Sequence, residues 1–221
     1  MQLTTVIFDM DGLLIDSEPL WQQAAYEVFK QYGVSFTQQQ YNTSVGLRTR
    51  EFVAYWFQYF QLDEQYLAQA EKDILTVVGM LIERNGNIMP GVPQIFEFFK
   101  QRNFKIGIAT SSPQTLIDIV VRKANLSSYL HATSSAEDME NGKPHPQVYL
   151  DCAAKLNSAP LQCVCFEDSF NGMIAAKAAR MKCVVVPHGS MQKEERWAAA
   201  DLKLSSLQNF GQLHFGLLNQ S

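Results

Sequence analysis

Short apolar runs recur along this chain, and each is followed by a stretch with helical periodicity. This alternation indicates βαβ units and a parallel sheet, because parallel strands need a crossover between them. A continuous run such as Val184-Val185-Val186 is typical of a strand that is covered on both faces. We therefore expect strands at 5–8, 104–109, 130–133, 163–166, 183–186 and 202–204, and helices at 92–101, 114–124, 147–156, 173–179 and 192–199.

One region, from about residue 17 to residue 84, has no recognisable strand. Apolar residues from Leu20 to Tyr32 form a helical stripe, with Asp16 or Ser17 as the N-cap, and residues 49–60 and 63–84 also have helical patterns. The sequence therefore predicts an α/β chain with a doubly wound, Rossmann-like parallel sheet. We expect an α/β core domain of residues 1–15 and 87–221 and an all-helical insert of residues 16–86.

Length and charge limit the classes of protein to which the chain can belong. Its 221 residues fit one large domain, or one domain that carries an insert. A net charge of −4 argues against a general binder of nucleic acid or anionic membranes, which needs a basic face. No apolar run reaches the ~18 residues of a membrane span, and Val6-Ile7-Phe8 lacks the basic flank of a signal peptide.

The four cysteines form no C-x-x-C pair, and no histidine stands at metal-binding spacing from them. Small apolar core residues in a reducing compartment explain them best. We therefore expect a cytoplasmic protein. The negative charge and the lack of sustained heptads favour a monomer.

Polar residues follow four of the expected strands at the point where each strand ends. Asp9-Met10-Asp11-Gly12 follows the first strand, Thr110-Ser111-Ser112 the second, Gly142-Lys143-Pro144 the third and Glu167-Asp168-Ser169 the fourth. Ligands of open parallel sheets bind at the carboxyl ends of the strands. The order therefore brings four acids, a hydroxyl cluster and one lysine to a single rim.

These residue types fit phosphoryl transfer. Acids crowded on one rim repel each other unless a cation lies among them, and Mg²⁺ prefers carboxylate oxygens and substrate phosphate. Lys143 and Thr110 offer a phosphate dianion a positive charge and a hydrogen-bond donor. One carboxylate can attack phosphorus, and a second one two positions along can move a proton. Each motif alone also fits a turn or a helix cap, so the prediction depends on all four in order.

The four motifs resemble those of the haloacid dehalogenase-like superfamily of phosphotransferases. The matching stretches are FDMDG at 8–12, IATS at 108–111, KPHP at 143–146 and FEDS at 166–169. The helical insert looks like the small α-helical cap domain of this family. The resemblance implies that Asp9 is the nucleophile and Asp11 the general acid and base.

The resemblance also implies a phosphate site and a Mg²⁺ site. The phosphate would be bound by Met10, Thr110, Ser111 and Lys143, with Met10 and Asp11 contributing backbone N–H groups. The Mg²⁺ would be held by Asp9, the Asp11 carbonyl oxygen and Asp168, with Glu167 as a supporting or alternative ligand.

Longer stretches resemble bacterial sugar-phosphate phosphatases that act on 2-deoxyglucose 6-phosphate and hexitol phosphates. These stretches are DMDGLLIDSEPLW at 9–21, KPHPQVYLDCAAKL at 143–156 and NGMIAAKAARM at 171–181. Residues 45–48, Val-Gly-Leu-Arg, resemble a substrate-contacting loop of the cap. Arg48, Glu18 and Trp21 are thus candidate substrate contacts, although Arg48 also fits a solvated loop and Trp21 also fits a core position.

The sequence therefore predicts a Mg²⁺-dependent hydrolase of small sugar or polyol phosphates that works through an aspartyl-phosphate. Its partner would be a small phosphorylated metabolite. One alternative is a phosphosugar mutase of the same superfamily, although its pattern has a histidine where this chain has Trp21. Another alternative is an inactive module that binds metal and phosphate, which the intact Asp9 and Asp11 disfavour.

Overall fold

The computed structural model describes residues 2–44 and 47–220. Its centre is a six-stranded sheet in which all neighbouring strands run parallel. The strands are β1 (Thr5–Phe8), β4 (Lys105–Thr110), β5 (Ala132–Ser135), β6 (Cys163–Glu167), β7 (Lys182–Val185) and β8 (Leu202–Lys203). Their order is β5-β4-β1-β6-β7-β8. Strands β4 and β5 are thus added on one side of β1, and β6, β7 and β8 are added on the other side.

Helices cover both faces of this sheet, because side chains of successive strand residues point to opposite faces. Val6 and Phe8 belong to one apolar cluster, which includes α5 (Val92–Lys100) and α6 (Gln114–Lys123). Ile7 belongs to the other cluster, with α7 (Gln147–Lys155) and α8 (Phe170–Ala178). The predicted doubly wound fold is confirmed. All four cysteines are free and buried in the second cluster, as expected of core residues.

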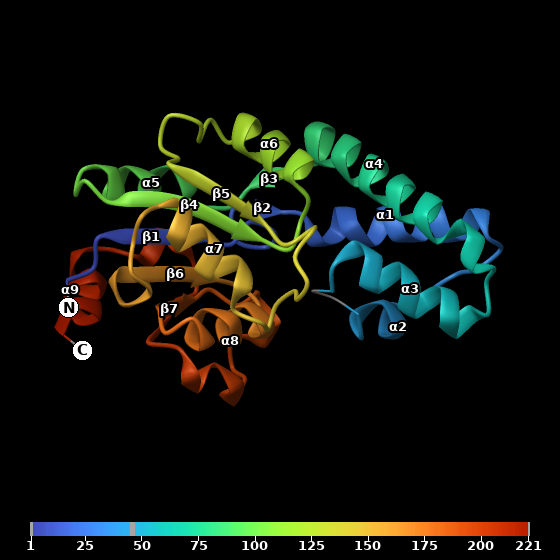
Figure 1. Cartoon of the computed structure of the whole chain (residues 1–221). Helices are drawn as coiled ribbons and strands as arrows, with labels where there is room; N and C mark the ends of the chain where they lie inside the picture. The colour runs from blue at the N-terminus through green and yellow to red at the C-terminus, as the bar shows by residue number, and fades with distance from the viewer. Residues whose placement is uncertain (1, 45–46, 221) are drawn as a thin grey trace.

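The insert is helical, and Figure 1 shows it beyond the carboxyl ends of the strands. It consists of α1 (Glu18–Gln31), α2 (Gln38–Asn42), α3 (Thr49–Phe60) and α4 (Leu67–Asn85), with a 3-10 turn at Glu64–Tyr66. Its interior is aromatic: the rings of Phe29 and Phe57 have centroids 5.7 Å apart, and those of Phe36 and Trp56 are 5.0 Å apart. This aromatic interior packs the helices of the insert against one another, and it is continuous with the apolar cluster on one face of the sheet.

A small antiparallel ribbon lies where the chain leaves the sheet and where it returns. Strands β2 (Ile15–Asp16) and β3 (Asn87–Ile88) pair Ile15 with Ile88 and Asp16 with Asn87. The predicted boundaries at 15–16 and 86–87 fall in this ribbon. Two residues per strand are too few for a periodic pattern, so the sequence does not indicate the ribbon.

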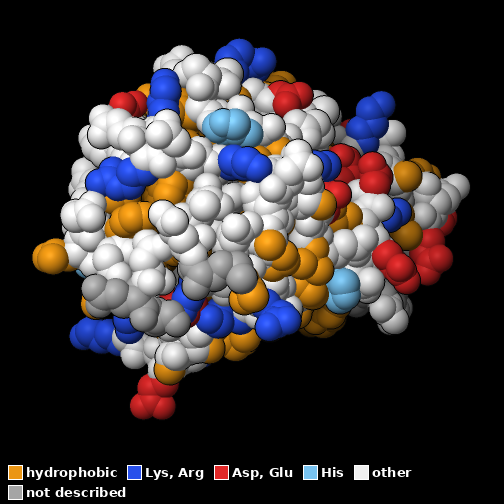
Figure 2. Space-filling model, turned by 60° about the vertical axis from the view of Figure 1, so that its left-hand side comes forward, with side chains coloured by type: hydrophobic (Ala, Val, Ile, Leu, Met, Phe, Trp, Pro, Cys, Tyr) orange, Lys and Arg blue, Asp and Glu red, His pale blue; other side chains and the backbone are white. Residues whose placement is uncertain are grey.

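Three other elements differ from the expectation. Residues 192–199 do not form one α-helix, because Trp197 is the buried residue of the 3-10 turn Glu195–Ala199 and no apolar stripe supports a longer helix. Helices α2 and α9 (Gln212–Gln220) were not expected. Among the described residues, no helix combines the length and apolar character that a membrane crossing requires. The face in Figure 2 carries side chains of both charges.

Candidate active site

The register of the sheet places the first strand's aspartate between two other strand ends. Phe8 of β1 pairs with Ile108 of β4 on one side and with Phe166 of β6 on the other. The Asp9 N–H donates to the Phe166 carbonyl oxygen at 2.9 Å, which continues the ladder by one residue. Asp9 therefore lies at the centre of the rim, between the residues that follow β4 and those that follow β6.

Lys143 connects this aspartate to the end of β6. Its Nζ lies 2.6 Å from Asp9 Oδ1 and 2.6 Å from Glu167 Oε1, and it also donates to the Ala109 carbonyl oxygen at 3.2 Å. Burial alone lowers the pKa of Lys143, but the two carboxylates outweigh burial and hold this pKa above its ordinary value. The lysine is therefore a fixed positive charge on the rim.

Asp9, Glu167 and Asp168 each offer one carboxylate oxygen, and these oxygens lie within 4.8 Å of one another. Burial raises the pKa of Asp9 to about 8, against the opposing effect of Lys143 and with a further contribution from Glu167. Burial and the charges of Asp9 and Glu167 also raise the pKa of Asp168. Buried carboxylates this close need more positive charge than one lysine supplies, and a hard divalent cation fits the oxygen donors.

Glu167 differs from the other two acids because protein donors already surround it. Its Oε1 accepts hydrogen bonds from Lys143 and from the Tyr149 hydroxyl at 2.5 Å. Its Oε2 accepts from the Ser169 N–H at 3.2 Å and from Ser169 Oγ at 3.0 Å. Asp168 accepts no hydrogen bond from any described residue. This difference favours Asp168 over Glu167 as a direct metal ligand and assigns Glu167 to holding Lys143.

Two glycines allow these carboxylates to approach the backbone. A Cβ on Gly12, which has φ +75°, would lie 2.2 Å from Asp168 Oδ2. A Cβ on Gly172, in the first turn of α8, would lie 1.8 Å from Glu167 Oε1. No larger residue fits at either position without moving a carboxylate.

Asp11 bridges the core and the insert. Its Oδ1 accepts hydrogen bonds from Ser17 Oγ at 2.7 Å and from Trp21 Nε1 at 3.0 Å, both near the start of α1. Its Oδ2 accepts from Ser112 Oγ at 2.7 Å and from Thr110 Oγ1 at 3.4 Å, both after β4. Trp21 thus contacts Asp11 through its indole N–H, and it also packs against the apolar cluster, as the alternative core position predicts.

The remaining predicted residues have different surroundings. Met10 is buried, and its carbonyl oxygen accepts from the N–H groups of the following turn. Ser111 is half-buried at the rim. Glu18 is half-buried in the first turn of α1, where burial and the charges of Asp11 and Asp16 raise its pKa to about 7. Glu18 accepts no hydrogen bond from the described residues, so its carboxyl group is available to a ligand.

The predicted loop at 45–48 is described in part. Val45 and Gly46 lie outside the described residues, and Leu47 is exposed. The Arg48 guanidinium donates to Glu51 and to the carbonyl oxygens of Ala136 and Met139, so in this structure it contacts protein acceptors.

Ser17, Ser112 and Tyr149 are polar neighbours of the site that sequence reasoning did not single out. Ser112 belongs to the hydroxyl cluster after β4, and Ser17 stands at the predicted N-cap of the first helix of the insert. These two positions are the signals that the sequence offers for them. Tyr149 lies in the first turn of α7, and the sequence has no signal that its hydroxyl contacts Glu167.

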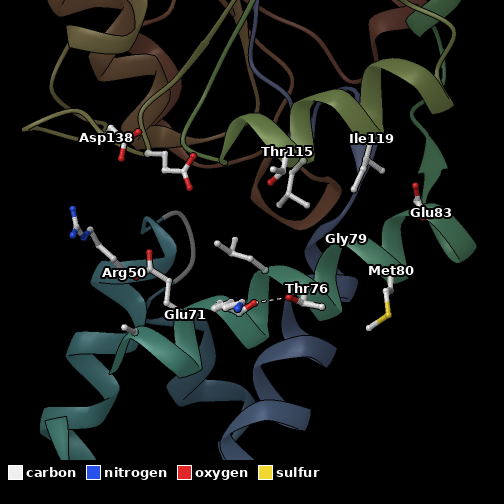
Figure 3. Close-up of a pocket in the computed structure, with 14 residues that line it drawn as sticks. Arg50, Glu71, Thr76, Gly79, Met80, Glu83, Thr115, Ile119 and Asp138 are labelled. Carbon is white, nitrogen blue, oxygen red and sulfur yellow. Dashed lines mark hydrogen bonds between the residues drawn. The ribbon is translucent and has the colours of Figure 1, made fainter. Parts of the chain in front are cut away.

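A cavity of about 650 Å³ lies elsewhere, between α4 and α6 (Figure 3). None of the predicted site residues lines it. The candidate active site is therefore assigned from the clustered side chains at the strand ends and not from this cavity.

Comparisons with known proteins agree with this geometry. A model of the haloacid dehalogenase-like hydrolase family matches residues 6–186, so the chain belongs to this family. It is 41% identical over 207 residues to hexitol phosphatase B of Escherichia coli K12. These residues cover 93% of this chain and 93% of that protein. It is 33% identical over 180 residues to a phosphorylated carbohydrates phosphatase of Thermotoga maritima. The matched region covers 80% of this chain and 82% of that protein. The predicted family and the similarity to sugar phosphatases are confirmed.

Solved structures of other proteins have the same fold. CbbY from Rhodobacter sphaeroides, in complex with phosphate, has a TM-score of 0.86 at 24% identity, covering 97% of this chain and 99% of its own. β-Phosphoglucomutase from Clostridium difficile has a TM-score of 0.86 at 22% identity, and the match covers 99% of this chain and 98% of that one. At these identities the likeness concerns the fold alone.

Proposed function

We propose that this chain is a phosphatase that hydrolyses small sugar or polyol phosphates, with Mg²⁺ as cofactor and Asp9 as nucleophile. The observation that carries the proposal is the position of Asp9 at the centre of the rim, 2.6 Å from Lys143 and clustered with Asp168. The 41% identity to hexitol phosphatase B supports the substrate class. The helical insert would act as the cap that covers this substrate.

Phosphate binding follows from the charges on the rim. Lys143 supplies a buried cation, and Ser111 and the backbone after Asp9 supply donors for the phosphate oxygens. Asp9, Asp168 and the Asp11 carbonyl oxygen would hold Mg²⁺, with Glu167 supporting through Lys143. A bound Mg²⁺ would neutralise charge on the phosphate and would keep Asp9 ionised.

The reaction then takes two steps at Asp9. A carboxylate oxygen of Asp9 attacks phosphorus, the bond to the sugar oxygen breaks, and Asp11 gives that oxygen a proton. In the second step Asp11 takes a proton from water, and the water oxygen attacks the phosphorus of the aspartyl-phosphate. Inorganic phosphate leaves and Asp9 is regenerated. Hydrogen bonds from Ser17, Trp21 and Ser112 fix the position of the Asp11 carboxylate.

A phosphate-release assay over a panel of sugar and polyol monophosphates tests the proposal. The purified protein with Mg²⁺ should release phosphate from one or more hexose or hexitol 6-phosphates without a bisphosphate primer. Asp9→Asn is the matched control, because it removes the nucleophile and leaves the shape of the side chain unchanged. Phosphate transfer between sugar hydroxyls with little release would indicate a mutase. No turnover of any substrate, p-nitrophenyl phosphate included, would indicate an inactive binding module.

A further inference from the structure

Arg48 is the N-cap residue of α3, and Glu51 fixes its side chain. The Glu51 carboxylate accepts from Arg48 Nε at 2.9 Å and from Nη2 at 2.5 Å, and it also accepts from the Arg48 backbone N–H at 3.1 Å. The Arg48 side chain is only 11% exposed. A guanidinium paired in this way has a defined direction, which leaves its Nη1 group for a second partner.

That second partner belongs to the core. Arg48 Nη1 donates to the Met139 carbonyl oxygen at 2.6 Å and to the Ala136 carbonyl oxygen at 3.3 Å. The arginine also lies against Gly142, where a Cβ would be 2.9 Å from Nε and 3.1 Å from Cδ. One side chain of the insert thus hydrogen-bonds to Ala136 and Met139 of the core segment 136–142 and lies against Gly142 at its end.

This segment leads directly into the site. Lys143 follows Gly142, and its Nζ contacts Asp9 and Glu167. At the other end of the segment, the Ala136 N–H donates to the Thr110 carbonyl oxygen at 2.9 Å. A shift of segment 136–142 would therefore move both Lys143 and the end of β4.

Acidic residues oppose the contact between the insert and this segment. Figure 3 shows Glu71 of α4 and Asp138 of the segment on opposite sides of the cavity. Burial and the charges of Asp138 and Glu71 raise the pKa of the neighbouring Glu137, so these like charges lie close enough to repel. The Arg48 hydrogen bonds to Ala136 and Met139 therefore join the insert and the segment close to acids that repel each other, and Arg50 also lines this cavity.

We propose that Arg48 is a positioning residue: it fastens the helical insert to segment 136–142 and so places Lys143 for phosphate binding, and it does not bind the leaving group. The inference rests on the proposed phosphatase function. It differs from the sequence expectation of a substrate contact, because the Arg48 donors that the structure describes already meet protein acceptors.

The test compares Arg48→Ala with Arg50→Ala. Arg50 is exposed and lines the cavity beside Glu137 and Asp138, but it makes no hydrogen bond or ion pair with the described residues of segment 136–142. Arg50→Ala therefore controls for the loss of a positive charge near the segment. Each variant is assayed with acetyl phosphate and with a hexitol 6-phosphate. A positioning role predicts that Arg48→Ala lowers kcat/KM by about tenfold or more on both substrates, by the same factor. Arg50→Ala should leave both values near those of the wild type. A loss confined to the hexitol phosphate would overturn the proposal, because it would show contact with the leaving group.

Hydrogen exchange gives a readout that does not depend on turnover. Backbone amides of 136–143 should exchange faster in Arg48→Ala than in the wild type or in Arg50→Ala. Unchanged exchange in this segment would overturn the proposal. If Arg48→Ala does not fold, Glu51→Gln weakens the same anchor and should shift exchange in the same direction by less. A wild-type protein without phosphatase activity would refute the proposed function, while the exchange result would still decide whether Arg48 holds the segment.

Discussion

Two parts of the candidate site differ in how far the protein itself satisfies their polar groups: the Lys143–Glu167 pair of the core and Glu18 of the insert. On the core side, Lys143 contacts two carboxylates and Glu167 accepts from four donors. On the insert side, Glu18 is half-buried and has no hydrogen bond to the described residues. The phosphate-facing groups are thus preorganised, while Glu18 is open to a ligand. Changes on the core side should therefore affect every substrate, and a change at Glu18 should affect chemistry far less.

The largest effect is expected from Asp9→Asn. The variant lacks the attacking carboxylate, so turnover of every phosphomonoester should fall to background. Phosphate release is the measurement, and an unchanged circular dichroism spectrum is the control for folding. Appreciable activity in this variant would mean that the nucleophile lies elsewhere. The expectation that changes on the core side affect every substrate would then fail.

Asp11→Asn comes next, because Asp11 joins the two sides. General acid–base groups contribute ~10²–10⁴-fold, so hydrolysis of a sugar phosphate should fall by about that factor. Acetyl phosphate has a good leaving group and needs little proton donation, so it should still phosphorylate Asp9. Mass spectrometry should then detect a phosphoryl adduct on Asp9 that the wild type turns over too fast to accumulate. An adduct on another residue would contradict the proposed pathway.

Metal removal should act on the core side alone. EDTA should abolish activity and Mg²⁺ restore it, while Ca²⁺ should inhibit because its higher coordination number can occupy both oxygens of Asp9. Asp168→Ala removes one ligand, so calorimetry without substrate should show Mg²⁺ affinity lowered by about tenfold or more. Glu18→Gln serves as the comparison, since it removes a charge from the insert side. Equal Mg²⁺ affinity in Asp168→Ala and the wild type would exclude Asp168 from the metal site.

The smallest effect concerns stability and pH at Glu18. Its pKa is about 7 in the folded protein, above the ordinary 4.5, so folding favours the protonated form. The stability that this group contributes is present below pH 4.5 and is lost as pH rises through about 7. The slope cannot exceed about 1.4 kcal/mol per pH unit for one proton. Urea unfolding between pH 5 and 8 should show a shallower decline in Glu18→Gln, and parallel curves would contradict this account.

Strand ends were the most predictable feature of the molecule, because apolar runs and the residues after them are visible in the sequence. Strand β1 and helix α3 have the predicted bounds. The structure brings Asp9, Lys143 and Asp168 to one rim, as the order of motifs indicates. Their catalytic roles stay predictions.

Side-chain partners across the sheet could not be predicted in the same way. The Tyr149 hydroxyl reaches Glu167, and the Arg48 guanidinium reaches Met139, over 18 and 91 positions of sequence. No local pattern encodes such pairs, since they depend on how α7 and the insert pack. The turns at 192–199 differed for a related reason: propensity suggested a helix, but tertiary contacts bury only Trp197.

The ribbon of β2 and β3 has a consequence for how such a chain can change. Both connections to the insert leave the sheet side by side, at paired residues Asp16 and Asn87. A different helical module could therefore be joined at these two points without altering the strand order or the residues at the strand ends. On the proposed function, exchange of the module would replace the groups that the insert brings to the site, Ser17, Trp21 and Arg48, while the strand order and the acids at the strand ends would stay the same.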